Sequence, residues 1–339
     1  MGRGADIVDS ILHGTVVVLI RLLKALPLGT ALALGRALGA FAYHVLRIRR
    51  RTVLLNLRHI LGEGASAADL RRIARSAYGQ FAMTLVEVLR CSVTEPGQLD
   101  IDVEIEGLDR LHACRAAKTP LIFCFAHAGN VDLVGFGAAA AGLTIHAVMK
   151  PLKSLRFNRL LVGSRERHGI RVLMKGADAF LELVEVLEGG GMVALLPDQN
   201  PRTHGVRVDF LGQPAATFKG PAVLHLLTGA TLVVGIDERR ADDPRRHVVH
   251  LTFLPPHEET GDRDADIRAV TQRMSDSMGE LIRRNPAQYF WFHKRWGTRH
   301  ARPPAPAAAP TSPAAAASAP ADGSRRPAYG RAEDGAADA

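Results

Sequence analysis

Residues Leu121–Asp132 read Leu-Ile-Phe-Cys-Phe-Ala-His-Ala-Gly-Asn-Val-Asp, and this stretch decides the fold. Its first five residues are all apolar, which is typical of a strand buried on both faces. A Gly-Asn turn follows, and residues 131–141 then have the character of a helix. A buried strand that leads through a short turn into a helix is the repeating unit of parallel α/β sheets.

The same alternation of short apolar runs and helical segments continues along the chain. We expect strands at 144–149, 170–174, 192–196, 231–236 and 247–254, and helices at 154–168, 177–188, 264–284 and from Thr217, as its cap, to Leu227. An amphipathic helix at 68–90 precedes them. This order predicts an α/β fold with a largely parallel central sheet flanked by helices.

The N-terminal segment is both apolar and basic. Residues 10–46 are rich in Leu, Val, Ala and Gly, but Arg21, Lys24 and Arg36 interrupt the run and Pro27 breaks it. We expect two membrane-associated helices that lie in the interface, or of which one dips through the bilayer; the alternative is a buried helical hairpin. The first 60 residues carry nine Lys and Arg against two Asp, which favours an anionic membrane face over nucleic acid.

Composition divides the chain into three expected parts. Residues 1–48 form the membrane-associated helical segment, and residues 49–300 form the α/β domain. From Ala301 onward more than half of the residues are Ala or Pro without apolar periodicity, so we predict that residues 301–339 are disordered. The three cysteines have no close spacing, and no cluster of ligand residues predicts a metal.

His127 is the first candidate for chemistry. The chain has three pairs with the spacing His-x₄-acid: His127/Asp132, His204/Asp209 and His257/Asp262. Only His127 directly follows a buried strand, and parallel sheets bind ligands at that edge. A neutral imidazole there can take the proton of an attacking hydroxyl. The Asp132 carboxylate would bond its other ring nitrogen and fix the tautomer. The alternative is a structural histidine.

Two further groups of residues are candidates for the same edge. Asp198 and Gln199 follow the strand at 192–196, where the alternative role is a turn. Lys150, Arg165 and Arg167 could hold a phosphate of a substrate, unless they only form a solvated helix face. Residues 286–296 contain both tryptophans among basic residues, which suits a membrane interface, an acyl-channel wall or a core segment.

Several blocks, taken in order, resemble one enzyme family over roughly residues 15–297. They are Arg49-Arg-Arg-Thr-Val-Leu-Leu-Asn56-Leu57, Phe125–Asp132, Met149–Pro151, Arg165–Arg167 with Gly169, Pro197–Gln199, Phe210–Gly212, Pro214, Thr217–Gly220 and Trp291–Trp296. Together they are similar to the lipid A biosynthesis (lauroyl/myristoyl) late acyltransferases, within the lysophospholipid and glycerol-3-phosphate acyltransferase superfamily.

The resemblance implies a glycerol-3-phosphate acyltransferase-like fold and acyl transfer without a cofactor. His127 and Asp132 take the catalytic positions, and Arg165 and Asp198 match positions important for activity. Acyl-acyl carrier protein would be the donor and a phosphorylated lipid A precursor the acceptor, among membrane lipids at the cytoplasmic face of the inner membrane.

Two alternatives remain open at this point. Asp132 stands where the lipid A enzymes typically have Glu, whereas Asp also occurs in phosphatidylinositol mannoside acyltransferases. Transfer from acyl-CoA to such a glycolipid is therefore one alternative. A lipid-binding protein without turnover, in which His127 is only a packed residue, is the other.

Overall fold

The computed structural model describes residues 3–62, 64–152, 154–176, 178–201, 203 and 205–297, with side chains from residue 14 onward. The predicted disordered tail at 301–339 lies outside the described residues, and so does His204.

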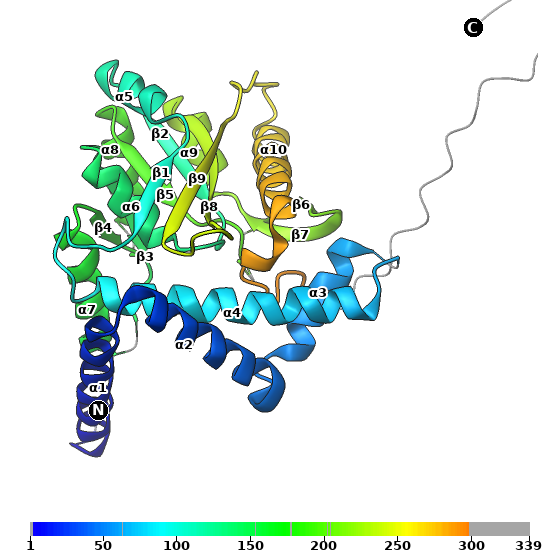
Figure 1. Ribbon diagram of the computed structural model, residues 1–339. Helices are drawn as coiled ribbons and strands as arrows, with labels where there is room; N and C mark the ends of the chain where they lie inside the picture. Colours follow the sequence, from blue (N-terminus) through cyan, green and yellow to red (C-terminus); the bar gives the residue numbers. More distant parts are fainter. Residues whose placement is uncertain are drawn as a thin grey trace, which may run out of the picture. The chain divides into compact units, whose positions relative to one another are not determined.

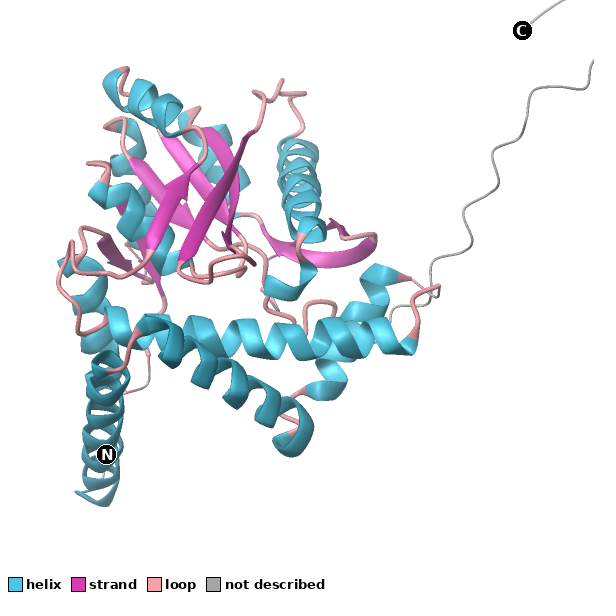
Figure 2. Ribbon diagram, viewed as in Figure 1, coloured by secondary structure: helices cyan, strands magenta, loops and turns pink. Residues whose placement is uncertain are grey.

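A seven-stranded sheet forms the centre of the fold (Figures 1 and 2). Its strands are β1 (Asp102–Ile105), β2 (Leu121–Phe125), β3 (Ile145–Met149), β4 (Arg171–Met174), β5 (Met192–Leu195), β8 (Thr231–Arg239) and β9 (Arg246–Phe253). They lie in the order β1-β9-β8-β2-β5-β3-β4. The strands from β8 to β4 are parallel, whereas β9 runs antiparallel to β8 and parallel to β1. The prediction of an α/β fold with a mostly parallel sheet is confirmed.

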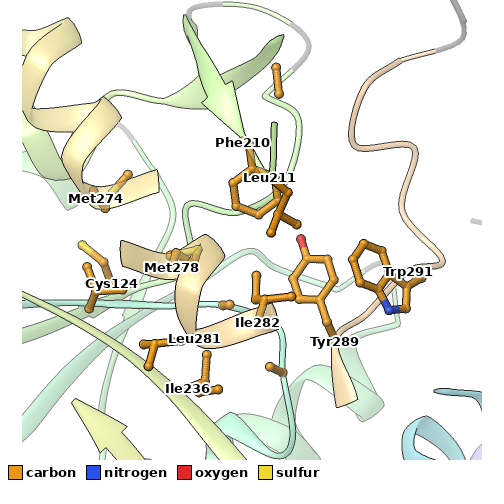
Figure 3. Packing of buried hydrophobic residues seen from close by; sticks show 14 of the residues in the cluster. Cys124, Phe210, Leu211, Ile236, Met274, Met278, Leu281, Ile282, Tyr289 and Trp291 are labelled. Atoms are coloured by element: carbon orange, nitrogen blue, oxygen red, sulfur yellow. The ribbon is translucent and has the colours of Figure 1, made fainter. Parts of the chain in front are cut away.

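Helices cover both faces of this sheet. They are α5 (Leu108–Ala116), α6 (Val131–Ala140), α7 (Leu155–Arg167), α8 (Ala179–Glu188), α9 (Gly220–Thr228) and α10 (Arg263–Arg284). Successive side chains of a strand point to opposite faces, so Phe123 and Phe125 of β2 pack with α5 and α6. Ile122 and Cys124 belong instead to the main core, to which α10 contributes Met274, Met278 and Leu281 (Figure 3).

Four α-helices precede the sheet in the described residues. They are α1 (Arg3–Ala25), α2 (Leu28–Phe41), α3 (Arg50–Leu61) and α4 (Ala67–Cys91), with a π-helical turn η1 (Ala42–Leu46) after α2. Pro27 is the N-cap of α2, so the chain breaks where the sequence predicts. Gly39 lets α2 approach α4 closely, because a Cβ there would lie 2.4 Å from the Tyr78 carbonyl oxygen. In the described part of the chain, no helix is both long and apolar enough to cross a bilayer.

The prediction at Thr217 was wrong. Thr217 lies in β7 (Gln213–Phe218), which forms a hairpin with β6 (Gly205–Phe210), and α9 begins only at Gly220. The Thr217 hydroxyl accepts a hydrogen bond from the buried Arg295 guanidinium, 2.6 Å from Nη2, instead of capping a helix. Helices α3 and α5 and strand β1, which are short or polar segments, were not predicted from the sequence.

Candidate active site

His127 lies at the carboxyl edge of the parallel strands. It follows β2, which pairs with β5 so that Cys124 lies opposite Leu195. The residues after both strands therefore emerge side by side, and Asp198, which follows β5, reaches His127. Asp198 Oδ1 is 2.6 Å from His127 Nδ1, and the backbone N–H of His127 donates to Oδ2 at 3.1 Å. One carboxylate thus holds both the ring and the backbone of His127.

The expected hydrogen bond between Asp132 and His127 was wrong. Asp132 lies in the first turn of α6, where its backbone N–H donates to the N-cap Asn130 at 3.2 Å. The helix directs the Asp132 carboxylate to α7, where Arg165 Nε donates to Oδ1 at 2.9 Å. A fixed sequence spacing could not show this, because the first turn of a helix sets the direction of the side chain. The catalytic role of Asp132 stays a prediction.

The electrostatics of His127 suit a general base. Burial lowers the pKa of His127, but the charge of Asp198 and their hydrogen bond more than offset this and raise the pKa above its ordinary value. The Asp198 side chain is only 1% exposed, whereas that of His127 is 34% exposed. With the Nδ1 proton donated to Asp198, Nε2 carries the lone pair, and the Gln199 amide nitrogen lies 3.3 Å from it.

The segment that follows α10, around Trp291 and His293, contacts the turn that contains Asp198. The amide of Asn56 in α3 donates to the carbonyl oxygens of Trp291 and His293, at 2.7 and 2.8 Å. The backbone N–H of Asn200 in turn donates to His293 Nε2 at 3.0 Å. Trp291 is completely buried and none of residues 286–296 lines the cavity beside His127, which favours the core alternative over a channel wall. The membrane-interface alternative stays a prediction.

A cavity of about 660 Å³ opens beside His127. Most of its wall is apolar, and its polar wall consists of His127, Asp132, Lys150, Arg165, Lys175 and Gln199. The structure thus gathers the predicted residues on one cavity, with Asp198 behind the ring. Arg167 is not among them, because its guanidinium donates to the Ser92 carbonyl oxygen at 3.3 Å.

A buried ionic network lies under the His127 loop and was not predicted from the sequence. It consists of Glu87 in α4, Asp237 and Arg239 in β8, and His247 in β9, all almost completely buried. Arg239 Nη2 donates to Glu87 at 2.6 Å, and His247 Nδ1 lies 2.7 Å from Asp237. Charged residues inside otherwise apolar runs are the signal that could have revealed it.

This network is bonded directly to the loop between β2 and α6. The backbone N–H of Asn130 donates to Asp237 Oδ2 at 2.6 Å, and the Asn130 amide donates to Glu87 at 3.1 Å. Burial lowers the pKa of His247, but the charge of Asp237, with the hydrogen bonds to Asp237 and Glu87, raises it to about 9. A protonated His247 and Arg239 then balance the two carboxylates.

Fold and site together define an enzyme class. An imidazole backed by a buried carboxylate, open to an apolar cavity with cations on its wall, suits proton removal from a hydroxyl beside a long apolar chain. Residues 7–298 match the family of bacterial lipid A biosynthesis acyltransferases. The chain belongs to this family and is an acyltransferase.

Individual relatives agree with this assignment. The chain is 27% identical over 254 residues to a phosphatidylinositol mannoside acyltransferase of Mycobacterium tuberculosis, which covers 71% of this chain and 75% of the relative. It is 26% identical over 280 residues to the lipid A biosynthesis palmitoleoyltransferase of Escherichia coli, covering 81% and 87%. The lipid A biosynthesis lauroyltransferase of Escherichia coli is 24% identical over 286 residues, covering 82% and 89%.

Proposed function

We propose that this chain transfers a fatty acyl group from acyl-acyl carrier protein to a hydroxyl of a lipid A precursor. The observation that carries the proposal is the His127 ring, whose Nδ1 is held by Asp198 while Nε2 faces the cavity. Nε2 takes the hydroxyl proton as the acceptor oxygen attacks the thioester carbonyl carbon. The carbon–sulfur bond breaks, the thiolate leaves with that proton, and an ester is formed without a covalent enzyme intermediate.

The other cavity residues divide into two roles. The apolar wall takes the acyl chain, because burial of methylene groups favours binding at about 0.8 kcal/mol each. Lys150 and Arg165 contact the phosphate of the acceptor, and the 2.9 Å contact with Asp132 orients the Arg165 guanidinium for it. Gln199, which now approaches His127 Nε2, moves aside for the acceptor hydroxyl.

Two observations favour a second acceptor class. The relatives include phosphatidylinositol mannoside acyltransferases at 27% identity, and the chain carries Asp132 rather than Glu. Acyl transfer from acyl-CoA to a mannosylated phosphoinositide is therefore the alternative. It uses the same base and the same cavity.

An assay with purified protein distinguishes the two proposed acceptor classes. Each donor, acyl-acyl carrier protein and acyl-CoA, is combined with a lipid A precursor or with phosphatidylinositol mannoside, and the products are read by mass spectrometry. We expect one added acyl group on the lipid A precursor and its loss in His127→Ala, with protein yield and melting temperature retained. Acylation of the mannoside alone would replace the first acceptor by the second, and undiminished transfer by His127→Ala would refute the role of the imidazole.

We also propose that the enzyme acts at the cytoplasmic face of the inner membrane. Large apolar side chains are exposed on α1, α2 and η1, namely Val18, Leu19, Leu22, Leu34, Leu38, Phe41, Val45 and Leu46. They support an interfacial position in which basic residues of the same segment meet anionic lipid. Both the lipid acceptor and the carrier protein can reach the enzyme there.

A further inference from the structure

A second cavity, of about 640 Å³, shares no residue with the catalytic one. We call it the arginine groove. It is lined by Arg47, Arg50, Arg51, Leu54, Leu55, Arg58, Ala67, Leu70 and Arg71, from the end of η1, α3 and the start of α4. Five of these nine residues are arginine and the rest are apolar. Within the described ranges, no acidic residue lines it.

The arginines are held or exposed in different ways. The Arg50 guanidinium lies over the Tyr43 ring at 4.4 Å, and Arg47 Nε donates to the His44 carbonyl oxygen at 3.4 Å. Arg51, Arg58 and Arg71 are exposed. Five positive charges around one groove repel one another. An anion bound in the groove would offset this repulsion, because every one of the five guanidinium groups attracts it.

An apolar ridge precedes the groove in the chain. Phe41, Val45, Leu46 and Ile48 each expose about half of their surface, between 49% and 60%. Ile48 lies between two arginines whose backbone is left-handed, with φ of 52° at Arg47 and 54° at Arg49. Residues other than glycine rarely adopt this conformation, and it often marks functional turns.

The turn at Ile48 is fixed from the protein side. The Tyr78 hydroxyl donates to the Ile48 carbonyl oxygen, and Arg49 Nη1 donates to the Phe292 carbonyl oxygen at 3.0 Å. These two hydrogen bonds hold the turn in place, so the Ile48 side chain stays exposed although Arg47 and Arg49 have an unfavourable backbone conformation. Exposed apolar residues that alternate with arginines match the boundary between headgroups and acyl chains of a bilayer.

We propose that the arginine groove binds the phosphate of an anionic phospholipid headgroup while the apolar ridge enters the acyl region beside it. This is a lipid site separate from the catalytic cavity. An acidic protein surface would satisfy the arginines, but it would leave four exposed apolar side chains without a counterpart. The inference rests on the proposed location of the enzyme at the membrane surface. It is independent of which lipid accepts the acyl group.

Vesicle flotation with the full-length protein tests the inference. Vesicles of phosphatidylcholine alone are compared with vesicles that also contain phosphatidylglycerol. The groove variant combines Arg51→Gln, Arg58→Gln and Arg71→Gln, and it spares Arg50 because of its contact with Tyr43. The control variant combines Arg263→Gln, Arg268→Gln and Arg284→Gln, which are exposed on α10 and remove the same charge.

We expect the groove variant to bind phosphatidylglycerol vesicles about a hundredfold more weakly than the wild type, and the control variant to bind within about twofold of it. Ile48→Gln weakens binding to the same vesicles. Equal losses in both arginine variants, or wild-type binding without preference for phosphatidylglycerol, would overturn the proposal. So would a groove variant that keeps vesicle binding but needs more acyl-acyl carrier protein, since the groove would then dock a protein. Binding is read without acyl transfer, so a failed transferase assay leaves this test intact.

Discussion

At the scale of single residues, His127 has two carboxylates in the same site, but of these two only Asp198 contacts the imidazole. Asp198 is buried and contacts both the ring and the backbone of His127. Asp132 is bound to Arg165 instead. We therefore expect the two acids to differ in what they do: Asp198 would set the tautomer and pKa of His127, and Asp132 would set the position of the Arg165 guanidinium.

Asp198→Asn separates these roles through the pH profile. The Asp198 charge raises the pKa of His127, so its removal lowers that pKa and moves the acid limb of kcat/KM to lower pH. We also expect kcat to fall by roughly 10²- to 10⁴-fold, because the tautomer is no longer fixed. Asp132→Asn should leave the acid limb in place. An acid limb that moves in Asp132→Asn and not in Asp198→Asn would reverse the assignment.

At the scale of elements, the loop between β2 and α6 is shaped by its contact with β8. Gly129 has a φ of +63°, and a Cβ there would lie 2.3 Å from both the carbonyl oxygen and Oδ2 of Asp237. Both atoms are constrained, because Oδ2 accepts from the Asn130 backbone and the carbonyl belongs to a strand. Only glycine fits between the network and His127.

Gly129→Ala is therefore expected to be costly, with a matched control available. The substitution should lower the free energy of unfolding by at least about 2 kcal/mol and reduce acyl transfer, through strain and displacement of His127. Gly212→Ala also places alanine at positive φ, +85°, but with nothing within 4 Å. It should cost about 1 kcal/mol and leave activity intact. Equal effects of the two in denaturant melts and assays would show that the contact with Asp237 is unimportant.

The junction of β8, β9 and α4 should respond to alkaline pH. His247 has its pKa raised from 6.5 to about 9, so its protonated form stabilises the fold fully below about pH 6.5. That contribution, roughly 3 kcal/mol, is lost as the pH rises toward about 9. In His247→Gln it is absent, so the gap in unfolding free energy between wild type and variant should narrow over this range. A gap that stays constant with pH would show that His247 is neutral in the folded protein.

The elements show how far sequence reasoning reaches. The five strands from β8 to β4 follow from their apolar runs, although β4, at the edge of the sheet, has no buried residue. The β6–β7 hairpin does not, since residues 205–218 alternate buried and exposed positions with polar side chains, and Thr217 resembles a helix cap. Asp198 was predicted at the correct edge, but its bond to His127, 71 residues away, depends on the pairing of β2 with β5.

At the scale of the whole molecule, the cavity beside His127 is lined from both faces of the sheet. On the α6 side it is lined by buried residues that extend to α5, among them Leu111, Phe123, Val134, Ala138 and Ile145. On the α8 side its wall includes Lys175, Gly176 and the exposed Phe180. The α6 side is the more enclosed and apolar, so we expect the acyl chain there and the acceptor on the α8 side.

Substitution of two alanines in these walls tests which side of the cavity holds the acyl chain. Ala138 in α6 and Ala179 in α8 both line the cavity and are both buried. Leucine adds about three carbon atoms at either site and fills space that a ligand would use. Ala138→Leu should therefore shorten the preferred acyl chain by about two to three carbons, read by mass spectrometry of products from mixed-length donors. Ala179→Leu should keep the chain length and raise KM for the acceptor. The opposite pattern would place the acyl chain on the α8 face, and the walls of α8 and α9 would then set its length.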